Sequence, residues 1–190
     1  FHASNIEMII FEKTCDLASG RLKAKQIEED FKTYGHEVPL HIKALMLLNL
    51  ACFNIIDGNY TAAVKYLNTI LNTQELSIRT DVNKIARILQ LVIHYEMKNF
   101  DLLEYLLVST KKFLGSKLSK LEHALIKFFG NIVKHPADKH AAMFDELTFT
   151  IKRAADTNGI LNYFDFLSWA KAHATGKKLI DILKENMKET

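Results

Sequence analysis

Turn-forming residues recur along this chain at an almost constant interval, and this interval constrains the fold more than any other feature of the sequence. Every second turn signal lies at residues 19–20, 57–59, 98–99, 135–136 and 175–176, in steps of 38 or 40 residues. The intervening signals fall near residues 37, 76, 116 and 158, and the one at residues 35–39, which contains Pro39, is the clearest of all. Each gap between neighbouring signals has room for one helix of about 14 to 20 residues.

Apolar residues between the turns are spaced as in amphipathic helices. They recur three or four positions apart, for example at Leu45, Leu48, Cys52 and Ile55. Strict two-residue alternation never persists, and 7 Gly and 2 Pro are too few for an all-β chain with many turns. The sequence therefore predicts an all-α fold of about ten helices.

The regular spacing also predicts how these helices are organised. We expect five antiparallel hairpins at approximately residues 1–36, 37–76, 77–116, 117–158 and 159–190. A period of 20–50 residues is typical of a helical solenoid, in which each hairpin buries its apolar face against the next one. A length of 190 residues fits one domain. We therefore predict a single superhelical repeat domain over residues 1–190.

Two of the predicted hairpins share a sequence pattern at an offset of 40 residues. Residues 58–67 align with residues 98–107, and in both segments an Asn precedes an aromatic residue at the turn. Both then continue with a small or apolar pair and a Tyr-Leu region. We expect the aromatic residue to fill the gap between the two helices of the hairpin.

This pattern resembles the tetratricopeptide repeat. Leu47, Leu50 and Ala51 match the first-helix pattern of that family, residues 58–60 match its turn, and Ala63 matches its small second-helix residue. The stretch from residue 85 to 113, together with residues 163–169, also resembles the carboxy-terminal part of long bacterial repeat proteins. The resemblance implies a TPR-like scaffold that binds a partner peptide or helix on the concave face formed by its first helices.

On this chain the implied binding face is mainly apolar, and Asn49 is its one residue of the kind that grips a peptide carboxylate. His94 and Tyr95 follow on the next first helix. Aromatic residues near the carboxy terminus can add an interaction patch, because Tyr and Trp dominate interface hot spots. The partner-binding residues predicted from the sequence are Asn49, His94, Tyr95, Tyr163 and Trp169.

Motifs of catalysis and cofactor binding are incomplete in this sequence. His36 and His41 are five residues apart with Pro39 between them, so they do not share a helix face as zinc-protease ligands do. His135, Asp138 and His140 surround a turn and could gain His173 as a third metal ligand, whereas the calcium-like segment 154–165 lacks the required acidic ends. We expect no catalytic residue, no metal and no cofactor, and predict that the chain is not an enzyme.

A lysine-rich turn provides an alternative function. Lys111, Lys112, Lys117 and Lys120 cluster around one predicted turn and could bind nucleic acid. The formal net charge is only +3 and the isoelectric point is about 8.7, below the value above 9 that nucleic-acid-binding domains usually have. A protein or peptide partner is therefore the first prediction, and a nucleic-acid-binding or regulatory helical repeat is the alternative.

The cysteine content and the hydropathy of the sequence predict the cellular compartment of the protein. Two cysteines, Cys15 and Cys52, cannot form a disulfide framework and fit a reducing compartment. No run of 18 apolar residues occurs, so we expect no membrane span and a cytoplasmic location. The first residue is Phe1, which suggests a processed product or a piece of a longer protein, and further repeats could precede it.

Overall fold

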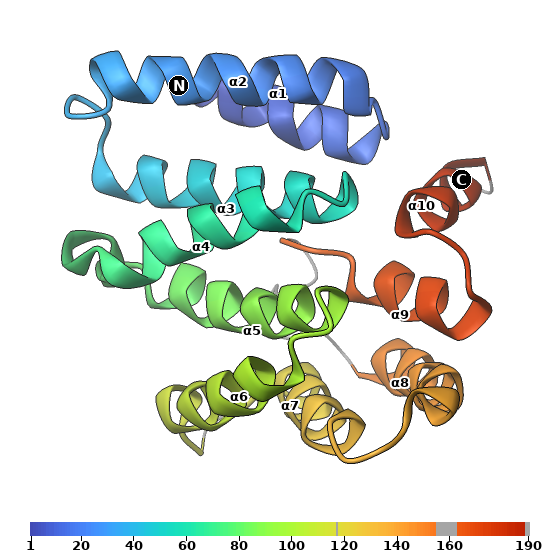
Figure 1. Ribbon diagram of the computed structural model, residues 1–190. Helices are drawn as coiled ribbons and strands as arrows, with labels where there is room; N and C mark the ends of the chain where they lie inside the picture. The colour runs from blue at the N-terminus through green and yellow to red at the C-terminus, as the bar shows by residue number, and fades with distance from the viewer. Residues whose placement is uncertain (117, 155–162, 189–190) are drawn as a thin grey trace. The chain divides into compact units, whose positions relative to one another are not determined.

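The computed structural model describes residues 1–116, 118–154 and 163–188, and within these ranges the chain is all-α (Figure 1). They contain ten α-helices and no strand, which confirms the predicted fold class and helix number. Two short 3-10 helices, η1 (Gln74–Ile78) and η2 (Ala137–Lys139), lie between α-helices. The α-helices are α1 (His2–Lys13), α2 (Leu17–Tyr34), α3 (Leu40–Ile56), α4 (Tyr60–Asn72), α5 (Thr80–Glu96), α6 (Phe100–Leu114), α7 (Lys120–Ile132), α8 (His140–Arg153), α9 (Phe166–Thr175) and α10 (Leu179–Lys188).

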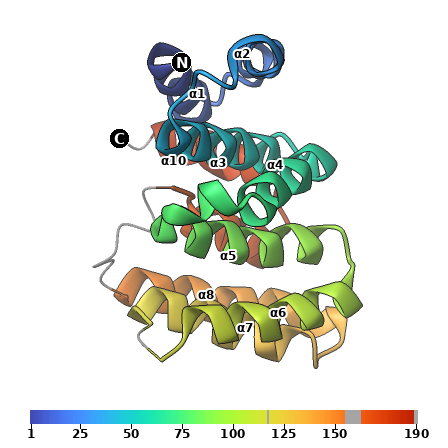
Figure 2. The same cartoon turned by 90° about the vertical axis from the view of Figure 1, so that its left-hand side faces the viewer.

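Each of the five predicted hairpin ranges contains two of these helices. The chain divides into two compact units, residues 1–86 and 87–190, with the boundary inside α5. In the first unit α1 packs on α2 and α3, and α4 packs on α3. In the second unit α6, α7 and α8 lie side by side, and α9 packs on α8 and α10 (Figures 1 and 2). This arrangement is compatible with a helical repeat, while the single domain, the antiparallel pairing and the superhelix stay predictions.

Four of the connections between helices have the same backbone structure, which we call the shared turn. In each, one residue just past the end of the helix has a positive φ: Cys15 (55°), Gly58 (77°), Lys98 (55°) and Gly176 (69°). The next residue donates its N–H to the carbonyl five positions earlier, over 2.8–3.0 Å. This six-to-one bond is the mark of the Schellman motif, which satisfies a carbonyl that the end of a helix leaves free.

The residue that makes this bond also begins the next helix in three of the four turns. The side chains of Asp16, Asn59 and Asn99 accept the backbone N–H three residues later, over 3.1, 3.3 and 3.4 Å. Asp and Asn are preferred N-cap residues because their short side chains reach these amides. The two residues of the turn therefore end one helix and start the next. This double role explains why an Asn stands before the aromatic residue in the sequence pattern.

The predicted turn at residues 19–20 is wrong. Gly20 lies within α2, and the shared turn of this helix pair is centred on Cys15 instead. The glycine serves close packing there, because a Cβ atom at residue 20 would lie 2.2 Å from Cε2 of Phe53. Gly20 therefore lets α2 approach α3. A glycine is needed at this position because it has no side chain, and not because the backbone must turn there.

The core of the first unit is α3, which is buried along most of its length. Polar bonds join the neighbouring helices at its edge. Arg21 of α2 forms a bidentate pair with Asp57 at the end of α3, over 2.6–3.0 Å, and Tyr66 of α4 donates to Glu28 over 2.7 Å. Burial and the adjacent carboxylate of Glu28 raise the pKa of Tyr66 far above its usual value, so its hydroxyl stays a donor.

The core of the second unit is aromatic. Trp169 is 1% exposed, and its ring packs against Phe128, Phe129 and Phe144 at centroid distances of 6.1, 5.9 and 5.1 Å. Most of the aromatic residues in the last third of the sequence are buried, although Phe149 is 61% exposed. This aromatic core fixes α9 against α7 and α8, and so fixes the position of every side chain that α9 presents.

Glycine substitutions at two helical positions separate packing from helix propensity. Gly20→Ala should lower the free energy of unfolding by about 1–3 kcal/mol, because the methyl group enters the space of Phe53. Gly130→Ala in α7 should raise it by up to about 1 kcal/mol, since a Cβ there would lie 3.5 Å or more from its neighbours. Chemical denaturation measures both values, and a stabilised Gly20→Ala would contradict the assigned packing.

A second pair of substitutions tests the shared turn. Gly58→Ala should destabilise the chain by about 1–2 kcal/mol, because an L-residue is strained at positive φ. Lys98→Gly should stabilise it by up to about 1 kcal/mol for the same reason. Lys127→Gly, inside α7, is the matched control and should cost about 1 kcal/mol. A loss of stability in Lys98→Gly equal to that control would show that residue 98 is helical.

Candidate functional site

The second unit contains a cavity of about 380 Å³ that is lined by aromatic and titratable side chains. It lies where the end of α5, the start of α6, the start of α8 and the end of α9 meet. Ala137 and Ala141 leave open space on one side of it. We call it the Glu96 cavity, and its lining residues are Tyr95, Glu96, Lys98, Phe100, Ala137, His140, Ala141, Phe144 and His173.

Glu96 is the acidic residue of the cavity, and α9 holds its carboxylate in place. Oε1 of Glu96 accepts the indole N–H of Trp169 and the Nε2–H of His173, both over 2.6 Å. Trp169 and His173 are four residues apart and therefore project from the same face of their helix. Hydrogen bonds to a charged acceptor are short and strong, so this pair fixes the carboxylate in the cavity wall.

Tyr95 and His140 form a second polar chain in the wall. Nε2 of His140 lies 2.9 Å from the carbonyl oxygen of His135, so this nitrogen carries the proton that it donates. Nδ1 of the same ring lies 3.1 Å from the hydroxyl of Tyr95 and is its hydrogen-bond partner. Burial, with a smaller effect from the charge of Glu96, raises the pKa of Tyr95 to about 12. The hydroxyl of Tyr95 therefore stays protonated near pH 7.

The ring of Tyr95 is the centre of the aromatic wall. Its centroid lies 6.0 Å from Phe100, 5.3 Å from Phe144 and 5.3 Å from His173, in edge-to-face arrangements. The imidazole of His173 stacks on Phe144 at 4.4 Å. Such pairs stabilise one another beyond their burial. The cavity therefore has rigid walls, and it places a fixed carboxylate beside several aromatic rings.

The structure brings two of the predicted partner-binding residues together. Tyr95 lines the Glu96 cavity, and Trp169 lies behind it with its indole bonded to Glu96. Tyr163 is half-buried just before α9. Asn49 and His94 lie elsewhere and are buried, with exposed fractions of 9% and 6%. Their role in binding stays a prediction, although burial keeps the side chains of Asn49, His94 and Trp169 away from the surface.

The apolar face predicted on the first helices is not open along α3. Leu48, Cys52 and Ile55 are buried, and α1 packs against this helix. Nδ2 of Asn49 donates to Oδ1 of Asn5 in α1 over 2.8 Å, so the amide that could grip a peptide carboxylate already has a partner. Burial also raises the pKa of the Cys52 thiol well above its usual range, which makes it a poor nucleophile.

The candidate metal ligands are only partly assembled. His140 and His173 line the same cavity, but His135 bonds the carbonyl of Asn131 over 2.8 Å. His36 lies next to Glu37 at 3.5 Å, and both are exposed. The ranges that the structure describes contain no group of three or more His, Cys, Asp or Glu residues placed to hold a metal. Most of the calcium-like segment, residues 155–162, lies outside those ranges.

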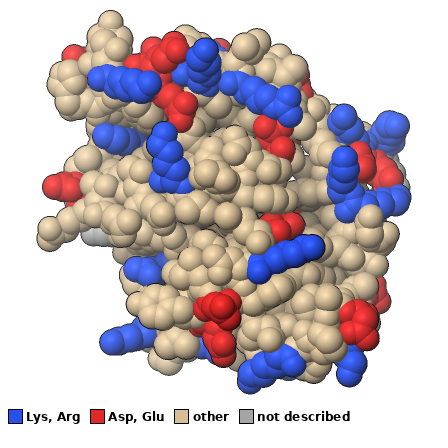
Figure 3. Space-filling model, in the orientation of Figure 1, with Lys and Arg blue, Asp and Glu red and all other residues tan. Residues whose placement is uncertain are grey.

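The lysines of the alternative site are on the surface where they are described. Lys111, Lys112 and Lys120 are exposed, whereas Lys117 lies outside the described residues. On the face shown in Figure 3, Lys and Arg side chains are interspersed with Asp and Glu, without a continuous basic stripe. That face therefore gives no focused positive field of the kind that polyanion binding uses.

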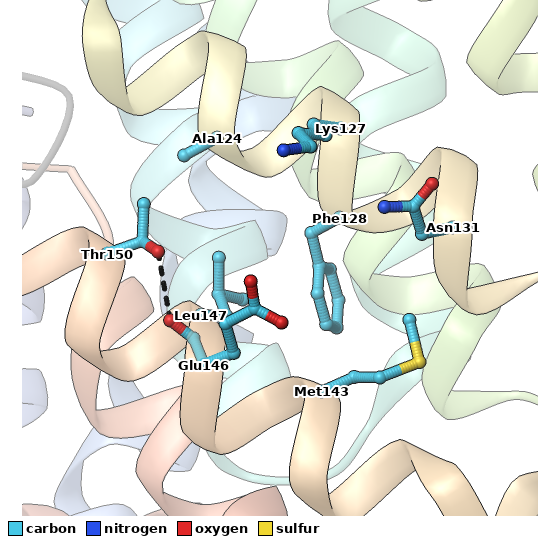
Figure 4. Close-up of a pocket in the computed structure, with 8 residues that line it drawn as sticks. All are labelled: Ala124, Lys127, Phe128, Asn131, Met143, Glu146, Leu147 and Thr150. Carbon is cyan, nitrogen blue, oxygen red and sulfur yellow. Dashed lines mark hydrogen bonds between the residues drawn. The ribbon is translucent and has the colours of Figure 1, made fainter.

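A second, smaller pocket lies between α7 and α8 (Figure 4). Its volume is about 100 Å³, and Phe128 and Leu147 form its apolar floor. Lys127 stands on the α7 side and Glu146 on the α8 side (Figure 4). A dashed line in the figure marks the bond from Oγ1 of Thr150 to the backbone carbonyl of Glu146, at 2.9 Å. Ligand pockets are usually about 300 Å³ or larger, so this one is only a shallow indentation.

Comparisons with protein-family models, with curated proteins and with solved structures give no significant match to this chain. In the described ranges, each α-helix is too short or too polar to cross a membrane. The residues of the Glu96 cavity are therefore interpreted from their geometry alone.

Sequence reasoning found part of this site. Tyr95 was predicted to bind a partner, and His140 and His173 were weighed as metal ligands, but nothing in the sequence joins Glu96 to Trp169, 73 residues away. The one available signal was the recurring turn at residues 98–99, which places the end of α5 and the start of α6 side by side.

Buried His94 predicts a pH dependence of stability. Within the described part of the chain its Nδ1 has no hydrogen-bond partner, and burial lowers its pKa below the unfolded value of about 6.5. The unfolded chain therefore binds more protons at this residue, so stability is full above pH 6.5 and falls as the pH drops below it. His94→Gln should flatten the difference in unfolding free energy between pH 8 and pH 5. The exposed control His41→Gln should leave it unchanged, and an equal effect of both would refute the assignment.

Proposed function

We propose that this chain is a non-catalytic protein–protein interaction scaffold of the helical-repeat type, TPR-like in architecture, which binds a partner peptide or helix through its second unit. The observation that carries the proposal is the Glu96 cavity. It is large enough for one long side chain, and the bonds of the chain itself hold its walls. A preformed cavity lowers the ordering cost of binding, so one inserted side chain can anchor a partner.

Exposed apolar side chains beside the cavity support this proposal. Met97 and Phe100 are 45% and 37% exposed at the turn between α5 and α6. Interfaces combine a central anchor with apolar contacts around it. A peptide that inserts a side chain into the cavity would rest on these two residues.

The chemistry of the cavity favours binding over catalysis. The described residues that line it include no Ser, Thr or Cys that could act as a nucleophile. His140 uses both ring nitrogens in bonds within the protein, so it has no free nitrogen to accept a substrate proton. With no Ser, Thr or Cys among the described lining residues and both ring nitrogens of His140 engaged, the function that fits these residues best is recognition.

Exposed residues of α6 favour one alternative, a nucleic-acid-binding or regulatory helical repeat. Lys111 and Lys112 are exposed on this helix, and the ring of Tyr105 is 71% exposed. Aromatic rings beside lysines can stack single-stranded bases. Asp101 and Glu104 are also exposed on this helix, and their negative charges offset the positive charges of the lysines. Protein binding is therefore the first proposal.

Filling the cavity tests the proposal. Random peptides displayed on phage are selected for binding to the wild-type chain. Their affinities are then measured for two variants, in each of which one alanine is replaced by tryptophan. Ala141→Trp places an indole in the cavity and should weaken selected peptides at least tenfold. Ala142→Trp, the exposed neighbour outside the cavity lining, should leave them unchanged. Failure to select any peptide, or equal binding by both variants, would overturn the proposal.

A further inference from the structure

We propose that a polar pocket in the first unit is a site for a neutral carboxamide group, carried by a Gln or Asn side chain of a partner. The inference goes beyond the proposed function, because this pocket is built by α2, α3 and α4 and shares no described residue with the Glu96 cavity. It is carried by a buried amide whose oxygen opens into the pocket and by lining charges that compensate one another.

The pocket has a volume of about 290 Å³, close to the lower limit for ligand pockets, and lies between α2 and α4 beside the end of α3. We call it the Asn54 pocket. Phe53, Asn54 and Tyr66 are buried residues of its lining, with exposed fractions of 1%, 6% and 6%. Ala24 on α2 and Ala62 on α4 also line it, and their short side chains leave room for a ligand.

Asn54 is the polar residue that points to a ligand. Its Nδ2 donates to the carbonyl oxygen of Leu50 over 2.7 Å, and this bond fixes the orientation of the amide because a carbonyl can only accept. No described residue donates to Oδ1 of Asn54, and this oxygen is not sealed from solvent. Its accessible side therefore opens into the pocket that Asn54 lines, and offers an acceptor to a bound donor.

The charged side chains of the pocket compensate one another. Arg21 forms the bidentate pair with Asp57, and Glu28 accepts the hydroxyl of Tyr66 over 2.7 Å. With the exposed Lys25, the described lining has two basic and two acidic residues and hence no formal net charge. An ion of either sign would meet a like charge there and would lose its water. A neutral polar group avoids both costs.

Asn59 supplies the complementary donor. It is the N-cap of α4, and its Oδ1 accepts the N–H of Ala62 over 3.3 Å, so Nδ2 is left for another acceptor. Its backbone N–H donates the six-to-one bond to the carbonyl of Asn54 over 2.8 Å, which ties both residues to one turn. A carboxamide has two N–H donors and an acceptor oxygen. One such group can therefore donate to Asn54 and accept from Asn59.

The remaining lining suits the apolar stem of such a side chain. The ring of Phe53 and the methyl groups of Ala24 and Ala62 have no hydrogen-bonding group. A Gln side chain would place its methylene groups against these residues and its amide beside Asn54. Polar groups that fix orientation next to apolar contacts are typical of ligand pockets.

The test is an NMR titration of the 15N-labelled chain, followed at the side-chain amides of Asn54 and Asn59. The probes are the Nα-acetyl N-methylamides of Gln, Glu and Met. Glu has the shape of Gln with a charge, and Met has a similar length without a carboxamide. We expect saturable shifts with the Gln probe and binding at least about tenfold weaker for the other two, because each leaves a polar group of the site unpaired.

An Asn-to-Asp pair provides the matched variants. Asn59→Asp keeps the capping oxygen, since Asp is also a preferred N-cap, but removes the Nδ2 donor. It should weaken binding of the Gln probe at least fivefold. Asn99→Asp makes the same change at the N-cap of α6, outside the lining of the Asn54 pocket, and should leave binding unchanged.

The outcomes also separate this inference from the proposed function. No saturable shift with the Gln probe, equal binding of the Met probe, or an equal loss in Asn59→Asp and Asn99→Asp would overturn the carboxamide assignment. Free L-glutamine binding more tightly than the Gln probe would overturn the assignment to a partner side chain. Asn54→Leu should abolish binding, and if its thermal unfolding shows that it does not fold, Asn59→Asp still decides. None of these results changes the peptide selection that tests the Glu96 cavity.

Discussion

A six-to-one hydrogen bond across a left-handed residue is the interaction on which both units of this chain depend. It ends one helix and, through the Asp or Asn that follows, begins the next one within two residues. The chain therefore passes from one helix to the next without a long loop, and the last turn of one helix lies close to the first turn of its successor. Side chains on those two turns are the ones that meet, and a site can be built there from residues close in sequence.

The Glu96 cavity makes use of this geometry. The turn at Lys98 places Tyr95 and Glu96 on one side and Phe100 on the other. Residues from α8 and α9 complete the wall, and the aromatic core around Trp169 fixes their distance. A carboxylate that would be costly to bury alone is stabilised there by two N–H donors. The same bonds that stabilise the second unit thus hold the Glu96 carboxylate in the wall of the cavity.

The sequence predicted the local structure well, but it did not predict the contacts between residues far apart in the chain. Apolar spacing and turn residues were sufficient for the all-α class, the number of helices and the turns at Gly58, Lys98 and Gly176, because these depend on neighbours in sequence. Gly20 was misread because a glycine can serve close packing as well as a turn, and only the position of Phe53 distinguishes the two. Bonds such as Glu96 to Trp169 join residues far apart in sequence, and no periodic pattern marks them.

Hydrogen exchange at single amides, measured by NMR, tests the shared turn most directly. The backbone amides of Asp16, Asn59, Asn99 and Lys177 each donate a six-to-one bond, although all four lie outside the regular hydrogen bonds of a helix. We predict that these four amides exchange much more slowly than expected for an unstructured chain of the same sequence. Exchange at the unstructured rate at Asn99 in the folded protein would contradict the turn that positions the Glu96 cavity.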